Sequence, residues 1–316
     1  MIASDPSRRS HLPSAIEWPS VALAACVYGG WIALTLCANA LPWWAVLPAG
    51  AWLTAWHMSL QHEVIHGHPT PWTRVNDAIG LPPLSPWLPY RRYQQTHLGH
   101  HRGANLTDPV DDPESHYVSA AGHEILHPLV RALLRADNTL LGRITLGPLI
   151  GVLGFWQREA RLLLAGNREV RRVWMWHVPA AAGVSAWLVL ACHLSPFRYL
   201  MLFAYPGYAL ALVRSFAEHR AAEHHDHRTA VVEHAPILGL LFLHNNLHVV
   251  HHLYPGLPWY RIPAIWRRQR AALLRRNGGL LYRGYGEICR RYLLRQHDSL
   301  VHSAPRLPAV PTSGGS

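Results

Sequence analysis

Residues 18–61 read WPSVALAACVYGGWIALTLCANALPWWAVLPAGAWLTAWHMSLQ and contain no Asp, Glu, Lys or Arg. A helix crosses the hydrocarbon core of a bilayer with about 20 apolar residues, so these 44 residues are long enough to cross it twice. Residues 39–42 (NALP) supply a turn near the middle, and Trp18 and Trp43 lie near span ends, where tryptophan anchors helices at the interface. The stretch therefore predicts a transmembrane hairpin with spans at about 18–38 and 43–61.

A second hairpin is predicted later in the chain. Residues 173–197 are uncharged, and a shorter apolar run at 199–213 continues past Arg214, so we expect spans at about 173–195 and 199–217. The arginines concentrate in the N-terminus, the middle segment and the tail, and the positive-inside rule assigns such segments to the cytoplasm. The sequence thus predicts an all-α, multi-pass integral membrane protein with four transmembrane helices in two hairpins and both termini cytoplasmic.

The composition excludes several other classes of protein. Half of the residues are apolar and 15% are charged, which excludes a disordered chain, and four cysteines exclude a disulfide scaffold. All 29 basic residues are arginine, and the net charge of +11 suggests an anionic partner or membrane surface. Eleven arginines lie between Arg261 and Arg306, but no nucleic-acid-binding motif accompanies them. We therefore expect no nucleic acid as partner.

These patterns divide the chain into four parts. We expect a flexible N-terminal arm at 1–15, a membrane domain at 16–260, a basic, amphipathic helical tail in the cytoplasm at 261–302, and a disordered end at 303–316, which is small, polar and proline-rich. A cleavable signal is an alternative for the first span, because Arg8 and Arg9 precede it. The apolar stretch runs on into a second span, however, which favours a retained hairpin.

Eight of the 24 histidines fall into three spaced clusters. The first has the form HxxxH (HEVIH, 62–66), and the other two have the form HxxHH (HLGHH, 97–101, and HVVHH, 248–252). Positions i, i+3 and i+4 share one face of a helix, so each cluster can direct its imidazoles at one point. Neutral imidazole is a common ligand of iron, zinc and copper. The clusters therefore predict a histidine-rich metal site on the cytoplasmic side, formed by His62, His66, His97, His100, His101, His248, His251 and His252.

Two other metal sites are compatible with part of this pattern. HEVIH at 62–66 matches the HExxH signature of zinc proteases, with Glu63 as general base. A catalytic zinc takes three protein ligands, however, so this interpretation leaves both HxxHH clusters without a role. A second match at 123–127 (HEILH) is followed directly by Pro128, and we interpret it as a chance match. A carboxylate di-iron site would use Glu-x-x-His pairs and also ignores HxxHH. A two-metal, histidine-rich site uses all three clusters and is preferred.

The order HxxxH, HxxHH, HxxHH around two hairpins resembles the membrane fatty acid desaturase and hydroxylase superfamily, over residues 16–260. The segment at 107–115 (TDPVDDPES) is similar to bacterial members, which implies the bacterial inner (plasma) membrane. The resemblance implies one further ligand, His219, after the fourth span, and a water-mediated metal contact from Asn245. The implied ligand set is His62, His66, His97, His100, His101, His219, His248, His251 and His252.

The resemblance also implies the chemistry. Two iron ions and dioxygen would oxidise an unactivated C–H bond of a long apolar chain. Loss of a second hydrogen gives an alkene, so a fatty acyl desaturase is expected, with a hydroxylase or ketolase of a long-chain lipid or carotenoid as the alternative. The electrons would come from a separate donor, such as ferredoxin with its reductase. Glu63 would then orient a histidine, and a membrane zinc metalloprotease using 62–66 stays the alternative from a different class.

Charged residues near the clusters suggest further roles. Asp111, Asp112 and Glu114 are candidate partners of a cationic metal site, or solvated loop acids. Arg91 and Arg92 are candidates for the head group of the substrate, with pairing to lipid phosphates as the alternative. The basic stretch at 259–276 is expected to lie on the membrane surface or to bind an acidic electron carrier. The substrate and its carrier stay open, as does the position of oxidation.

Overall fold

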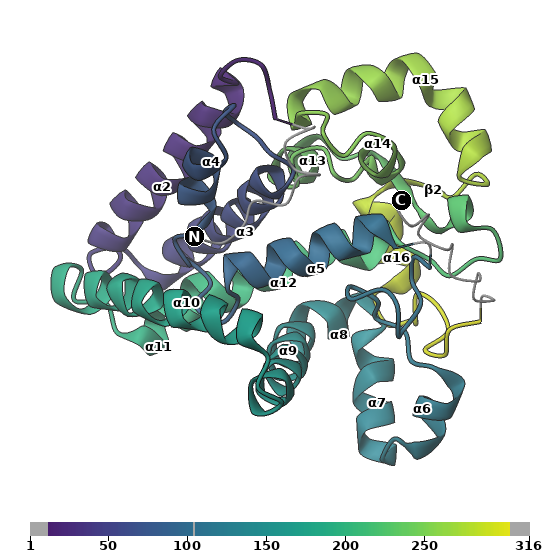
Figure 1. The fold of residues 1–316 in the computed structure, drawn as a ribbon, viewed down its shortest axis with the longest axis horizontal. Helices are drawn as coiled ribbons and strands as arrows, with labels where there is room; N and C mark the ends of the chain where they lie inside the picture. The colour runs from purple at the N-terminus through teal and green to yellow at the C-terminus, as the bar shows by residue number, and fades with distance from the viewer. Residues whose placement is uncertain (1–11, 104, 304–316) are drawn as a thin grey trace, which may run out of the picture.

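The computed structural model describes residues 12–103 and 105–303, and helices dominate it (Figure 1). The predicted arm at 1–15 and the end at 303–316 lie mostly outside the described residues. The first hairpin consists of α2 (Trp18–Cys37) and α3 (Trp43–Ile65). The second consists of two composite helices, which are α10 (Arg168–Ala186) with η1 (Trp187–Ala191), and α11 (Pro196–Tyr199) with η2 (Leu200–Ala204) and α12 (Tyr205–Glu218).

Three helices of the described chain are long and apolar enough to cross a membrane, at Trp18–Cys37, Arg168–Ala191 and Pro196–Glu218. They coincide with three of the four predicted spans. The fourth predicted span, at 43–61, falls on α3, which is 23 residues long but lacks a stretch as apolar as those of these three helices. Its C-terminal turns carry Gln61, His62 and Glu63, all of which are buried. The polar end of α3 belongs to the site and not to a lipid-facing surface.

The two hairpins pack closely at two glycines, which have no side chain to keep the helices apart. A Cβ atom on Gly207 of α12 would lie 2.5 Å from Cβ of Thr54, and one on Gly50 of α3 would lie 2.6 Å from the carbonyl oxygen of Leu202. Small residues let the backbones of neighbouring helices approach each other within a membrane protein. The contact between α3 and α12 therefore fixes the ends of both helices, at which several histidines lie.

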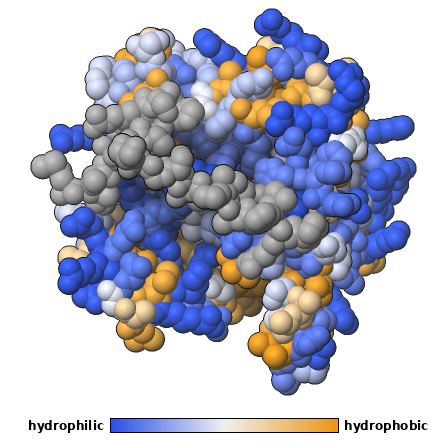
Figure 2. Space-filling model, turned by 45° about the vertical axis from the view of Figure 1, so that its right-hand side comes forward, coloured by the Kyte–Doolittle hydropathy of each residue, from blue (hydrophilic) through white to orange (hydrophobic). Residues whose placement is uncertain are grey.

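Between the hairpins, the residues that the structure describes form six helices. They are α4 (Thr73–Gly80), α5 (Tyr90–Arg102), α6 (Ala120–Ile125), α7 (Pro128–Asp137), α8 (Leu140–Thr145) and α9 (Gly147–Leu164). Large apolar side chains are exposed on α7 and α9 and at the end of α6, where Ile125 is 86% exposed. In Figure 1, α6 and α7 project at the lower right, and Figure 2 shows orange side chains on the lower part of this end of the molecule.

The C-terminal part covers the ends of α3, α5 and α12. Its elements are η3 (His225–Arg228), β1 (Val231–His234), α13 (Pro236–Leu241), α14 (His248–Leu253), η4 (Trp259–Arg261), α15 (Ile262–Arg276), β2 (Leu281–Gly284) and α16 (Tyr285–Tyr292). The strands β1 and β2 pair in parallel, with Val231 opposite Leu281. The amphipathic helix expected at 259–276 corresponds to η4 and α15, and Gly278 and Gly279, which have positive φ angles, follow the end of α15.

Candidate metal centre

Five of the nine predicted ligands form one group. His62, His66, His97, His101 and His251 each offer a ring nitrogen, and these five nitrogens all lie within 4.8 Å of one another. The end of α3 supplies the first two, α5 supplies His97 and His101, and α14 supplies His251. The Nε2 atom of His97 lies 3.0 Å from that of His66 and 3.1 Å from that of His101. Three separate elements thus meet at one point.

The remaining four predicted ligands, His100, His219, His248 and His252, form a second group of the same kind. His219 directly follows α12, while the others come from α5 and α14. Nε2 of His219 lies 3.1 Å from Nε2 of His100 and 2.9 Å from Nε2 of His248. Because α5 and α14 each contribute to both groups, the two groups are adjacent, and the stacked rings of His101 and His252 lie 4.4 Å apart between them.

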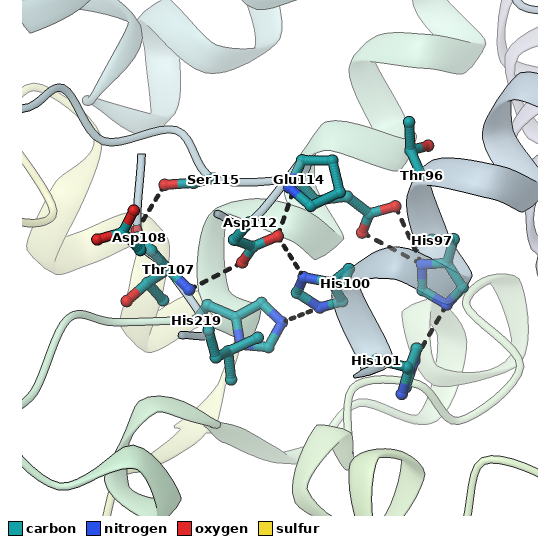
Figure 3. A network of polar contacts seen from close by, with 12 residues as sticks. Thr96, His97, His100, His101, Thr107, Asp108, Asp112, Glu114, Ser115 and His219 are labelled. Carbon is teal, nitrogen blue, oxygen red and sulfur yellow. Dashed lines mark hydrogen bonds and ion pairs between the residues drawn. The ribbon is translucent and has the colours of Figure 1, made fainter. Parts of the chain in front are cut away.

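Carboxylates of the loop after α5 hold two of these rings (Figure 3). Nδ1 of His97 lies 3.0 Å from Oε1 of Glu114, and Nδ1 of His100 lies 2.8 Å from Oδ1 of Asp112. Asp112 is buried and also accepts the backbone N–H of Thr107. Carboxylates in this position fix the ring orientation and raise the basicity of a ligating histidine. Of the three candidate acids, Asp112 and Glu114 therefore face the histidines, whereas Asp111 accepts from Asn105.

The tautomers implied by these contacts leave nitrogen lone pairs facing one another. Nδ1 of His219 contacts the carbonyl oxygen of Arg228, which can only accept, so Nδ1 carries the hydrogen and Nε2 is bare. Nδ1 of His248 contacts Oδ1 of Asn245, so this Nδ1 also carries the hydrogen and Nε2 of His248 is bare. Two bare Nε2 atoms then lie 2.9 Å apart. A buried contact between two lone pairs is repulsive unless a cation lies between them, so the donor set fits a metal ion.

The spacing of the nitrogens agrees with this. Metal–imidazole bonds are about 2.1 Å long, which puts the nitrogens of two ligands at right angles on one ion about 3.0 Å apart. The contacts within both groups fall between 2.9 and 3.1 Å, including those from His251 to His101 and from His252 to His248. Two neighbouring ions, one held by five and one by four imidazoles, would match this arrangement.

Burial keeps most of these rings in the form that binds metal. Burial, together with the nearby charge of His100, lowers the pKa of His219 to about 3. Burial also holds the pKa values of His101, His251 and His252 well below their usual range. The pKa of His100 is raised although burial opposes this, because Glu114 and Asp112 favour its charged form. At neutral pH most ligands are therefore neutral imidazoles, as coordination requires.

Asn245 bridges the two groups. Its Nδ2 lies 3.2 Å from Nε2 of His62, and its Oδ1 lies 3.2 Å from Nδ1 of His248. The residue predicted to contact metal through water is thus placed against one ligand of each group. The second HExxH match contributes to neither, since Nδ1 of His127 accepts from the backbone N–H of Leu129 at the start of α7.

A buried ion pair beside the centre was missed by the sequence analysis. Nε of Arg214 lies 2.8 Å from Oε1 of Glu218, and this carboxylate oxygen lies 3.3 Å from Nδ1 of His248. Arg214 lies in the predicted fourth span (199–217), and Glu218, four positions later, directly follows that span. A charged residue within an apolar span, with the opposite charge at i+4 just before His219, was a signal in the sequence, because a charge in a span is energetically costly and usually functional.

Glu63 and the two candidate head-group arginines have partners other than the nine histidines. Oε1 of Glu63 accepts from the backbone N–H of Trp259, and the carboxylate groups with Glu17 and His68, apart from the nine ligands. Arg91 pairs with Asp77, and Arg92 pairs with buried Glu159 at 2.8 Å. These arginines hold α5 to α4 and α9. Both guanidinium groups are therefore engaged within the fold and are not presented to a head group.

Comparison with models of protein families gives a match. The family model described as fatty acid desaturase matches residues 38–285, which include all nine histidines. No curated protein and no solved structure matches the chain. The match covers well over half of the sequence and runs from the turn of the first hairpin to α16. The chain belongs to the fatty acid desaturase family, within the membrane desaturase and hydroxylase superfamily.

Proposed function

We propose that this protein is an oxygen-dependent di-iron oxidoreductase of lipids that inserts a double bond into a fatty acyl chain. The observation that carries the proposal is the convergence of nine imidazoles in two adjacent groups, with nitrogen contacts near 3 Å. When bound, the iron pair would supply the activation of dioxygen and the oxidation of an unactivated C–H bond. Hydroxylation or ketolation of a long-chain lipid or carotenoid is the alternative on the same site.

The residues of the chain have separate tasks in this proposal. His62, His66, His97, His101 and His251 hold one iron, and His100, His219, His248 and His252 hold the other. Asp112 and Glu114 keep the hydrogen on Nδ1 of their histidines, so that Nε2 is free to bind. Six of the nine histidines are buried, as is Asp112, and this burial limits the access of bulk water to the site.

The electron balance of the desaturation requires a separate electron donor. Dioxygen takes up four electrons on reduction to two waters, and removal of two hydrogens from the acyl chain supplies two of them. A separate donor, such as ferredoxin with its reductase, supplies the other two, one at a time, and two protons complete the waters. We further propose four spans in a bacterial inner membrane, with α3 as the second span and with the metal centre and both termini on the cytoplasmic side, as the arginine distribution favours.

The position of Glu63 supports this proposal over a zinc protease. In a zinc protease the glutamate of HExxH acts as a base on the water bound to the metal. Here Oε1 of Glu63 accepts from the backbone of Trp259, 3.0 Å away. The protease would also leave at least six of the nine converging histidines without a role, since a catalytic zinc takes three protein ligands.

Metal analysis and lipid analysis of matched variants test the proposal. We expect about two iron ions per purified chain, and cells that express the protein should contain lipids that have lost two hydrogens. His100→Ala should remove the product and at least one iron, because His100 belongs to the second group. His123→Ala, in the second HExxH match, is the control and should change neither. One zinc per chain, with activity retained in His100→Ala, would contradict the proposal, and lipids that gain one oxygen would favour the hydroxylase.

A further inference from the structure

The outer face of α15 is strongly cationic. Exposed arginines follow one another along α15 and the residue before it, at Arg261, Arg267, Arg268, Arg270, Arg275 and Arg276. Arg270 pairs with Glu233 and Arg276 with Asp226. In the described part of the chain, no carboxylate forms an ion pair with Arg267, Arg268 or Arg275. These three guanidinium groups are available to a negatively charged partner.

The inner face of the same helix packs on α14, the helix that supplies three of the nine histidines. Ile262, Trp266 and Leu273 are buried in one cluster with Val249 and Val250 of α14. Those two valines lie between His248 and His251, which belong to different metal-binding groups. One helix layer, about 10 Å thick, therefore separates the arginines from the helix that supplies three ligands.

The apolar residues of α15 are used within the protein and not for the bilayer. A helix that lies in a membrane interface buries large apolar side chains among the lipids. None of the exposed large hydrophobic side chains of the described residues belongs to α15, whereas α7 and α9 expose several, including Leu129, Leu149 and Leu153. In Figure 1, α15 lies at the edge of the molecule opposite α6 and α7. A water-soluble acidic partner fits this face better than a membrane does.

We infer that the arginine face of α15 is the docking surface for an acidic protein that carries single electrons to the metal centre. The inference rests on the proposed oxidoreductase function, because only that function requires an electron donor. Two successive dockings supply the two electrons that complete the reduction of one dioxygen to two waters. Charge complementarity would increase the rate of association and make it fall with salt.

Binding of an acidic [2Fe–2S] ferredoxin to the purified full-length protein tests the surface without requiring turnover. The variant Arg267→Gln/Arg268→Gln/Arg275→Gln should bind about tenfold more weakly at low salt, as expected for three exposed ion pairs. Its binding should also depend less on salt. The control Arg135→Gln/Arg161→Gln/Arg168→Gln removes the same charge from exposed positions on α7, α9 and α10 and should bind within about twofold of wild type.

Two further measurements separate the possible outcomes. The α15 variant in nanodiscs should accept electrons from reduced methyl viologen at the wild-type rate, whether the lipids are zwitterionic or anionic. Equal ferredoxin affinity in wild type and variant would overturn the inference. A slower transfer of electrons from methyl viologen to the variant in anionic lipid alone would also overturn it, because that result would assign the arginines to lipid head groups. Failure of the proposed function is recognised separately, because ferredoxin would then bind while no lipid is oxidised.

Discussion

At the scale of single residues, Asp112 connects the loop after α5 to the metal centre. Its carboxylate accepts from Nδ1 of His100 and from the backbone N–H groups of Thr107 and Glu114. We expect Asp112→Asn to weaken iron binding about 10–100-fold, because an amide cannot support the same tautomer of His100 equally well. Competition with a chelator measures this, with Asp111→Asn as control. Equal iron affinity in both variants would show that Asp112 does not orient the ligand.

Glu218 gives a second prediction at this scale. Glu218→Gln would leave the buried guanidinium of Arg214 without its charge partner, which costs about 3–5 kcal/mol. We expect a lower thermal midpoint in detergent than for Glu124→Gln, whose side chain is exposed. The double variant Arg214→Met/Glu218→Gln should recover part of the loss, because no unpaired charge stays buried. A double variant as unstable as Glu218→Gln would contradict this explanation.

At the scale of elements, the predictable parts are those that a local pattern determines. The first span is expected at 18–38, and a helix is observed at Trp18–Cys37, because an unbroken apolar run has little alternative to a helix in a membrane. The helices α6 and α8 have six residues each and depend on tertiary contacts, so no periodic hydrophobic pattern in the sequence predicts them. The parallel pair β1 and β2 joins residues fifty positions apart, a pairing that no local signal specifies.

The contact between α3 and α12 provides a prediction for this scale. Gly207→Ala would bring a Cβ atom to 2.5 Å from Cβ of Thr54, so the two helices must separate. We expect a lower thermal midpoint and weaker retention of iron, because both helices end at ligands. Gly29→Ala in α2, where no atom lies within 4 Å of the new Cβ, should be neutral or slightly stabilising. If both alanine variants behave alike, close packing is not what this glycine provides.

At the scale of the whole molecule, the spacing of the histidines predicted which side chains meet, and two of the three acids named from the sequence, Asp112 and Glu114, contact them. HxxHH indicates a shared helix face on α5 and on α14, and both faces are directed at the other ligands. The arginines at 91 and 92, in contrast, suggested head-group binding because their partners, Asp77 and Glu159, lie on other helices. Charge alone does not identify a partner, since an ion pair within the fold and one with a ligand have the same local sequence.

The C-terminal segment provides the prediction for the whole molecule. Val118 forms a β-bridge with Val301, and Nε2 of His302 lies 3.0 Å from Oγ1 of Thr107. Thr107 in turn donates its backbone N–H to Asp112. Removal of residues 297–316 should therefore loosen the loop that orients His100 and speed the release of iron to a chelator. A chain that ends at Ser303 keeps these contacts and should release iron at the wild-type rate, so equal release from both truncated proteins would contradict this coupling.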